Sequence, residues 1–374
     1  MKVYLDNAGT TKPIEECLSK ALSVATENYY NPSAKYHEAI SLAENLKQAK
    51  NRILSRFPGY KAMFTSCGTE SDNTAVFGFF KRGNGVTSLG EHSAVYQSFE
   101  TLKQKGLTVR YAKLRKDGSV DVDDLLANVD ENTTFLSVMH VNNETGAIND
   151  INEIAKKAKS ISKKLVFHSD GVQAYGKLDY NLNSEYVDLY SASAHKIGAL
   201  KGTGLLLYRN GLHVPPFVVG GGQEDGLRSG TENVLGILDF CYCSELAYGN
   251  LKENYNKVKE LRDVFLRNVN SDKIFVVSSE NSSVYVLSLI IEGLRGEVIL
   301  HMLEDEGIIV GTGSACSSKR PHSRVLQACG YNSGQLDGVL RISFSPYNTV
   351  EEAEYAGEKL VQVVEKLYKV IYKK

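Results

Sequence analysis

Short apolar strands and helical segments alternate along the first two thirds of this 374-residue chain. The runs at 133–141, 164–170 and 186–193 have the length and composition of buried strands. The segment 151–164, between the first two, has helical spacing with a charged face. A strand–helix–strand rhythm is typical of a mostly parallel sheet flanked by helices. We therefore predict an α/β fold, in which ligands bind at the carboxyl ends of the strands.

The pattern changes near Lys252, where a long charged helix precedes a strand, a helix, a strand and a closing amphipathic helix. A chain of this length is typical of two domains, and its 42% of hydrophobic residues allows a substantial core. We predict a large domain over residues 13–255. A smaller α+β C-terminal domain covers 256–374 and also includes residues 1–12.

The overall charge is nearly balanced, with 43 basic and 44 acidic residues, which argues against nucleic acid as a direct ligand. The start, M-K-V-Y-L-D-N, lacks the apolar stretch of a signal peptide. The longest apolar runs, such as the one that begins at Val284, are too short to span a bilayer. We expect a cytoplasmic protein that does not bind a membrane.

The six cysteines stand at positions 17, 67, 241, 243, 316 and 329. In a cytoplasmic protein of this size we expect them to be reduced. The close spacing of Cys241 and Cys243 suggests a metal-binding pair. However, they lie in a helical segment, where positions two apart point to opposite sides. We predict that they pack in the core and that the protein has no metal site.

Polar residues follow four of the predicted strands. In chain order they are His92, Asn143, Asp170 with Gln173, and Ser193 with His195 and Lys196. Taken singly, each could be a turn residue, a helix cap or a structural histidine. Because a parallel sheet brings the ends of its strands to one edge, we expect these side chains to lie together.

The sequence offers two candidate phosphate sites, a Walker A loop and a site for pyridoxal phosphate. The run 171–177 has the glycine and lysine spacing of a Walker A loop, but Leu178 offers no hydroxyl to Mg²⁺, so nucleotide binding is disfavoured. Pyridoxal phosphate instead needs a lysine for its covalent bond, a carboxylate that keeps the ring nitrogen protonated, and a phosphate cradle. Lys196, Asp170 and the predicted helix start at Gly68-Thr69 suit those needs.

A series of motifs, in order and nearly end to end, makes the chain resemble a known family. The motifs are Y-L-D-N-A-G-T-T, N-P-S-A-K-Y-H, F-T-S-C-G-T-E-S-D-N, E-H-S-A-V, M-H-V-N-N-E-T-G, S-D-G-V-Q-A-Y-G-K, S-A-S-A-H-K-I-G-A-L-K-G-T-G, G-L-R-S-G-T-E-N, G-S-A-C-S-S and L-R-I-S. It resembles the cysteine desulfurases of the class V aminotransferase family, which have the pyridoxal-phosphate-dependent transferase fold-type I. The resemblance implies an enzyme with this cofactor.

The resemblance also implies roles at the cofactor ring. Lys196 would bond covalently to the cofactor and move the substrate Cα proton. Asp170 would pair with the ring nitrogen and Gln173 with the ring hydroxyl. His92 would lie over the ring and act in proton transfer.

Further roles concern the phosphate and the substrate. The phosphate would be held by Gly68, Thr69, Ser193 and His195. Thr231 would reach the phosphate of a partner subunit, which implies a homodimer. Arg341, assisted by Asn143, would bind the carboxylate of L-cysteine as a bidentate pair.

Cys316 lies in the glycine- and serine-rich run 310–322. The resemblance implies that its thiolate takes the substrate sulfur, leaving L-alanine and a persulfide. A protein acceptor for iron–sulfur cluster assembly or for tRNA or cofactor thiolation would then receive that sulfur. Glycines and serines permit such an excursion because they leave few packing contacts to break. Lys319, Arg320 or His92 would help the thiol ionise.

One departure from the family pattern is Cys67, which stands where a small residue such as glycine is expected, and we interpret it as a buried packing residue.

Two other functions remain open. One is a selenocysteine lyase or another β-elimination enzyme with the same cofactor. The other is a non-catalytic sulfur-carrier subunit, against which the set of Lys196, Asp170 and His92 speaks.

Overall fold

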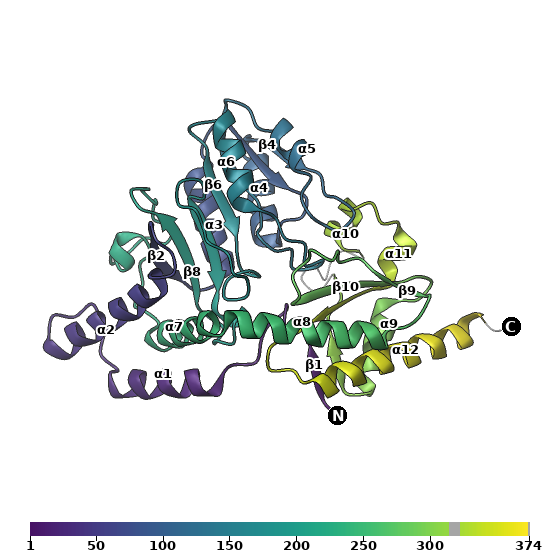
Figure 1. Ribbon diagram of the computed structural model, residues 1–374. Helices are drawn as coiled ribbons and strands as arrows, with labels where there is room; N and C mark the ends of the chain where they lie inside the picture. Colours follow the sequence, from purple (N-terminus) through teal and green to yellow (C-terminus); the bar gives the residue numbers. More distant parts are fainter. Residues whose placement is uncertain (314–321, 373–374) are drawn as a thin grey trace.

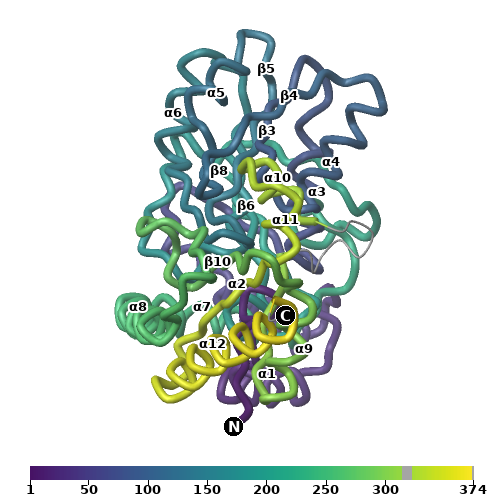
Figure 2. The backbone as a smooth tube through the Cα atoms, turned by 90° about the vertical axis from the view of Figure 1, so that its right-hand side faces the viewer, coloured from purple at the N-terminus to yellow at the C-terminus, as the bar shows by residue number. Residues whose placement is uncertain are grey.

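Seven strands form the central sheet, with helices packed against it (Figures 1 and 2). The structure, a computed structural model, describes residues 1–313 and 322–372. In spatial order the strands are β2 (Tyr60–Thr65), β8 (Gly204–Arg209), β7 (Leu189–Ser193), β6 (Val166–Asp170), β5 (Thr133–Ser137), β3 (Asn84–Ser88) and β4 (Thr108–Ala112). Strand β8 runs antiparallel to both its neighbours, and the other four pairings are parallel. The predicted α/β fold with a mostly parallel sheet is confirmed.

Both faces of this sheet are buried, which explains why its strands are continuous apolar runs. In β8, Leu205 and Leu207 pack into one hydrophobic cluster and Leu206 and Tyr208 into another, on the opposite face. We call the first cluster the large-sheet core. The helices that accompany the sheet are α1 (Glu15–Glu27), α2 (His37–Leu54), α3 (Gly68–Phe79), α4 (Ser93–Gln104), α5 (Val122–Ala127), α6 (Ile151–Ile161) and α7 (Val234–Gly249).

The predicted elements occur with small shifts at their ends. The strand expected over 133–141 ends at Ser137, although Val138 and His140 still donate their N–H groups to the carbonyls of His168 and Asp170 in β6, at 3.1 and 2.9 Å. Met139, between them, donates its N–H to the Glu91 carboxylate at 2.9 Å. Cys241 and Cys243 are both buried in α7, and the five cysteines in the described ranges are free thiols.

A second, smaller group of strands lies beside the large sheet (Figure 1). Strand β10 (Val286–Ile291) pairs antiparallel with β9 (Ile274–Val276) and β12 (Val339–Ser343), while β1 (Val3–Leu5) pairs parallel with β11 (Ile308–Val310). The helices here are α8 (Leu251–Asn268), α9 (Gly296–Asp305), α10 (Arg324–Ala328), α11 (Ser333–Asp337) and α12 (Val350–Tyr372). Strands β1, β10, β11 and β12 share one hydrophobic cluster with α8, α9 and α12, which we call the small-sheet core.

Helix α10 belongs to neither group alone. Val325 and Cys329 pack into the large-sheet core, whereas Leu326 packs with Ile290 and Val339 of the small sheet. In Figure 1 this helix lies between α5 and the small sheet. The division of the chain at residues 255 and 256 stays a prediction.

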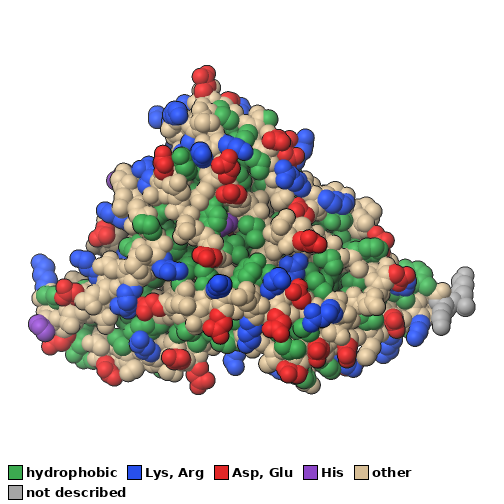
Figure 3. Space-filling view, viewed as in Figure 1, with side chains coloured by type: hydrophobic (Ala, Val, Ile, Leu, Met, Phe, Trp, Pro, Cys, Tyr) green, Lys and Arg blue, Asp and Glu red, His purple; other side chains and the backbone are tan. Residues whose placement is uncertain are grey.

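The surface shows no segregation of charge on the face drawn in Figure 3, where Lys and Arg side chains are intermixed with Asp and Glu. No helix in the described ranges is long and apolar enough to cross a membrane.

Candidate active site

A cavity of about 370 Å³ opens at the carboxyl ends of β6 and β7. Ten of the twelve predicted site residues line it, namely Gly68, Thr69, His92, Asn143, Asp170, Gln173, Ser193, His195, Lys196 and Arg341. Asp170 and Ser193 are the last residues of their strands, as expected for an α/β sheet. Of the other two, Thr231 is exposed in the loop before α7, and Cys316 lies outside the described residues.

One end of the cavity is a crowded group of charged side chains, which we call the ring end. Asp72, His92 and Asp170 each offer a ligating atom within 4.8 Å of the other two. The Val172 N–H donates to Oδ1 of Asp170 at 2.9 Å. Burial raises the pKa of Asp170, although the charges of His92 and Lys196 oppose that rise. A buried carboxylate of this kind is stabilised by a cation placed beside it.

Asp72 is the most deeply buried residue of this group. Its carboxyl is 1% exposed, and burial followed by the charge of Asp170 raises its pKa well above the usual value. His168 Nε2 lies 3.5 Å from Oδ1 of Asp72, but burial lowers the pKa of His168 to about 3, so the two do not form an ion pair at neutral pH. Burial and the neighbouring Asp170 charge therefore favour the protonated form of the Asp72 carboxyl.

His92 caps the N-terminus of α4. Its Nδ1 accepts the Ala94 N–H at 3.2 Å, which leaves Nε2 as the nitrogen that can meet a ligand. Burial lowers the pKa of His92, and the positive charges of Lys196, Arg324 and Arg341 act in the same direction, against Asp170. The ring is therefore neutral at pH 7.

Lys196 projects from the short turn after β7 toward the N-terminal segment. Its Nζ donates to the carbonyls of Ala8 at 2.6 Å and Gly9 at 2.7 Å. The Gln173 amide also donates to Ala8, at 3.0 Å, and accepts from Nζ of Lys177 at 3.3 Å. Burial lowers the pKa of Lys177 to about 7, and the charge of Lys196 acts in the same direction, so Lys177 is a second amine near Lys196.

A second part of the cavity, which we call the phosphate end, is made largely of backbone and hydroxyl groups. Helix α3 begins at Gly68, and no side chain caps its N-terminus, so its first N–H groups remain for an anion. A Cβ atom on Gly68 would lie 2.8 Å from Val172, which explains the glycine. Thr69 and Ser193 supply hydroxyls. Burial lowers the pKa of His195 to about 4, so its ring is neutral.

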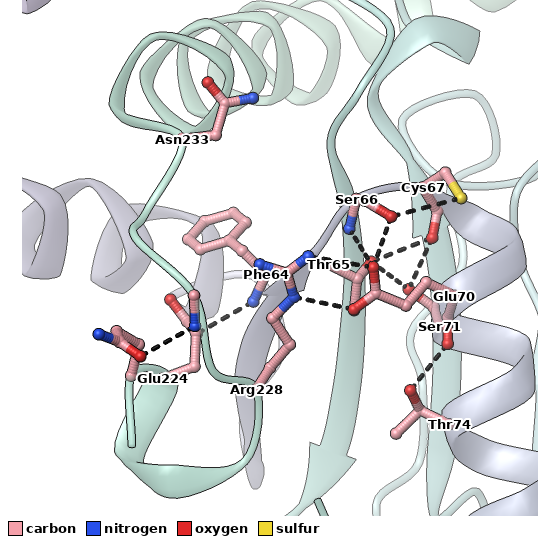
Figure 4. A network of polar contacts seen from close by, with 12 residues as sticks. Phe64, Thr65, Ser66, Cys67, Glu70, Ser71, Thr74, Glu224, Arg228 and Asn233 are labelled. Carbon is pink, nitrogen blue, oxygen red and sulfur yellow. Dashed lines mark hydrogen bonds and ion pairs between the residues drawn. The ribbon is translucent and has the colours of Figure 1, made fainter. Parts of the chain in front are cut away.

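A polar network fixes the backbone beside this end (Figure 4). Glu70 accepts the Ser66 N–H at 2.9 Å and binds Arg228 with both oxygens, at 2.9 and 3.3 Å. Glu224 accepts the Phe64 N–H at 3.0 Å. Arg228 and Glu224 belong to the loop that leads to Thr231, so this loop is attached to the phosphate end.

Cys67 differs from the sequence interpretation. We expected a buried packing residue, but Cys67 precedes the first turn of α3, is only half-buried and lines the cavity. Its position at the helix start, rather than inside the helix, turns it toward the cavity wall.

Arg341 stands on β12 and is 4% exposed. Its guanidinium donates to Oδ1 of Asp6 at 2.8 Å and to the backbone carbonyl of Asn143 at 3.0 Å, and its Nε has no partner among the described residues. Asn143 therefore contributes its carbonyl to the orientation of Arg341. A buried arginine with an unpartnered donor is suited to bind a carboxylate.

Sequence reasoning missed three residues of this cavity region. Asp6 and Asp72 were part of motifs that carried the family resemblance, where their acidic side chains were the available signal. Lys177 lies in the run that was set aside as a poor Walker A loop. Its contact with Gln173 spans one helical turn, a spacing that could have been recognised.

The comparisons with known proteins agree with this geometry. Residues 3–355 match the model of the family described as "Aminotransferase class-V". A cysteine desulfurase IscS of Dictyoglomus turgidum is 35% identical over 378 residues, covering 98% of this chain and 95% of the relative. A cysteine desulfurase IscS of Methanosarcina thermophila is also 35% identical, covering 98% and 92%.

Among solved structures, a NifS-like protein superimposes with a TM-score of 0.90 at 32% identity, covering 98% of this chain and 99% of its own. A NifS-like protein of Rickettsia africae gives 0.88 at 28% identity, covering 98% and 100%.

The chain thus belongs to the class-V aminotransferase family of pyridoxal-phosphate enzymes. Within that family it belongs with the cysteine desulfurases, since the relatives above match it along nearly their whole length. The predicted family, enzyme class and cofactor are confirmed.

The residues present fit this cofactor. Burial raises the pKa of Asp170, so a protonated pyridine nitrogen beside it would stabilise the carboxylate, and the uncapped start of α3 offers N–H groups to a phosphate. For this reason we assign the group of Asp72, His92 and Asp170 to the cofactor ring rather than to an ion. The absence of a metal site stays a prediction.

Proposed function

We propose that this protein removes sulfur from L-cysteine and carries it as a persulfide on Cys316. The observation that supports this most is the convergence of Lys196, Asp170 and Arg341 on one cavity. A lysine and a carboxylate serve the cofactor, and the arginine from the other sheet serves an amino acid carboxylate. One cavity therefore joins a cofactor site to an amino acid site.

The chain's own residues would divide the work as follows. Pyridoxal phosphate, when bound, withdraws electrons from the substrate carbon. Lys196 would attach it and then, with its amine freed, take and return the Cα proton. Asp170 would hold the ring nitrogen, and Gln173 the ring hydroxyl. His92 would exchange a proton through Nε2, and Arg341 would orient the substrate carboxylate.

The sulfur step would use Cys316. Its thiolate attacks the substrate sulfur, an S–S bond forms, and the C–S bond breaks with its electron pair left on carbon. That carbon takes up a proton. The balance is L-cysteine plus one protein thiol to L-alanine plus one protein persulfide, so no outside oxidant is needed. A reductant or acceptor then removes the sulfur.

The test is incubation with L-cysteine and dithiothreitol, with alanine and sulfide measured together. We expect equal amounts of the two products. Cys316→Ala should keep the yellow cofactor colour, release neither product above background and take no dithiothreitol-sensitive label from ³⁵S-cysteine. Normal alanine formation by this variant would sink the nucleophile role. Activity that survives with selenocysteine alone would favour a lyase.

We also propose a homodimer with shared active sites. Support comes from Thr231, which is exposed although its loop is fixed by Arg228 and Glu70, and from exposed apolar side chains nearby in the same loop, Phe217 and Val219. Mixing Thr231→Ala subunits with Lys196→Ala subunits should restore activity, since one site of each mixed dimer is then intact. Mixtures no more active than either parent contradict the sharing.

The acceptor proposed for the sulfur is a protein of iron–sulfur cluster assembly or tRNA thiolation. The names of the IscS relatives support iron–sulfur cluster assembly for those proteins. Transfer of ³⁵S from the labelled protein to purified candidate acceptors, resolved on a non-reducing gel, tests the acceptor class.

A cytoplasmic location is supported by the free thiols, which suit a reducing compartment.

A further inference from the structure

The segment that bears Cys316 is attached at its two ends to different parts of the molecule. Upstream, β11 belongs to the small-sheet core, and Gly311 exchanges backbone hydrogen bonds of 3.0 and 2.8 Å with Arg341. Downstream, α10 buries Val325 and Cys329 in the large-sheet core. The downstream attachment therefore ties the chain that follows the segment to the large-sheet core.

Arg324, the first residue of α10, makes most of that attachment. Its two terminal nitrogens donate to the backbone carbonyls of Leu89 and Glu91. Its guanidinium also lies 3.9 Å from the centre of the Tyr96 ring. Two directed hydrogen bonds and a ring contact fix a planar guanidinium more tightly than an ammonium could be fixed. Since Glu91 directly precedes His92, Arg324 holds the loop that positions His92.

The neighbouring residue makes a second attachment. The Ser323 hydroxyl donates to the Glu144 carboxylate and accepts the Leu326 N–H at 3.1 Å, which caps α10. Glu144 directly follows Asn143, whose carbonyl orients Arg341. Ser323, the N-cap of α10, and Arg324, its first residue, thus reach the two loops that carry Asn143 and His92.

We propose that Arg324 is a positioning residue for sulfur transfer. It holds residues 322–324, which directly follow the Cys316 segment, against the loop that carries His92. The inference rests on the proposed function. It assigns Arg324 no contact with substrate or cofactor. It predicts that Arg324 matters for the step that uses the protein thiol and matters little for steps that do not.

The charge of Arg324 provides an independent signature. His92 faces Asp170, which favours its protonated form, and Lys196, Arg324 and Arg341, which oppose it; the Asp72 carboxyl lies within 4.8 Å of the same group. Loss of the Arg324 charge should therefore raise the pKa of His92. Arg324→Lys keeps the charge but cannot make the two directed bonds, so it separates the electrostatic effect from the geometric one.

The experiment compares two substrates in the holoenzyme. L-cysteine needs the thiol of Cys316, whereas β-chloro-L-alanine loses chloride with its bonding electrons and needs no acceptor thiol. For Arg324→Ala we expect alanine formation from cysteine to fall about 10- to 100-fold, as for a misplaced reacting group. Pyruvate formation from β-chloroalanine and the cofactor spectrum should stay near wild type. The His92 limb of the kcat/KM profile should move to higher pH.

Arg324→Lys should share the slow reaction with cysteine but keep the wild-type pH limb. Arg56→Ala is the matched control, because it removes an arginine from the Tyr248 ring, 5.2 Å away, outside the cavity. Equal losses with both substrates, or a wild-type rate with cysteine in a folded Arg324→Ala protein, would overturn the proposal. A wild-type protein that binds no pyridoxal phosphate or leaves cysteine unchanged would instead contradict the proposed function itself.

Discussion

The ring end and the phosphate end of the cavity are built in opposite ways. The ring end consists of buried side chains from α3 and β6, with Asp72 and Asp170 at 1% and 4% exposure. The phosphate end consists of the uncapped start of α3 and of hydroxyl groups, among which Thr69 is exposed. Buried charges are costly and are kept where they change the chemistry. Backbone N–H groups bind an anion at little cost to stability.

The largest effect should come from Lys196, which lines the same cavity. Lys196→Ala should lower kcat/KM for cysteine by about 1,000-fold or more, since it removes both the covalent attachment and the proton carrier. Borohydride reduction followed by mass spectrometry measures the attachment. A reduced cofactor found on another lysine, such as Lys177, would move the assignment to that residue.

The next effect concerns the ring end. Asp170→Asn replaces the carboxylate beside the ring nitrogen by a neutral amide, and we expect kcat to fall about 100-fold or more. The cofactor should stay bound, because the phosphate end is intact. Stopped-flow spectra after mixing with cysteine measure the loss, and a wild-type kcat would show that the ring nitrogen needs no carboxylate here.

The phosphate end should be more tolerant. Thr69→Val removes one hydroxyl among several groups, so the Kd of pyridoxal phosphate for the apoenzyme should rise only about 2- to 10-fold. The kcat of the saturated enzyme should not change. Fluorescence titration of the apoenzyme provides the Kd. A loss of kcat at saturating cofactor would show that the phosphate end, like the ring end, affects the chemical steps and not only the affinity for the cofactor.

The smallest effect on activity should come from Asp72→Asn. Burial raises the pKa of Asp72 above that of the unfolded chain, so the folded protein binds this proton more tightly. This carboxyl thus contributes stability below its unfolded pKa and loses that contribution as pH rises through its folded pKa. The amide resembles the protonated acid and does not ionise.

The asparagine variant should therefore keep its kcat and melt at a higher temperature than wild type in apoenzyme at pH 8. The advantage should shrink on acidification toward pH 4. Calorimetry across this range measures it, and a variant that is less stable at pH 8 would mean that Asp72 is ionised in the folded protein.

Local pattern reveals many of the residues that sequence reasoning found, whereas the roles of Thr231, Arg341 and Cys316 came from the family resemblance. Asp170 and Ser193 end apolar strands, and parallel topology alone brings them together. Asp6 and Arg324, which sequence reasoning missed, act through contacts between distant parts of the chain. Arg324 and Glu91 are 233 positions apart, and Arg341 and Asp6 are 335 apart. No periodicity in the sequence encodes such distances, so these pairs become visible only in the folded chain.

The pairing of β1 with β11 also bears on when the cavity becomes complete. Val3 finds its partner, Ile308, roughly 300 residues later in the chain. Contacts this far apart are slow to form, because the long loop must close first. The carbonyls of Ala8 and Gly9, which receive the Lys196 amine, directly follow this strand. During synthesis Lys196 is therefore made long before its N-terminal hydrogen-bond partners are locked in place, so this side of the cavity is completed late in the folding of the protein.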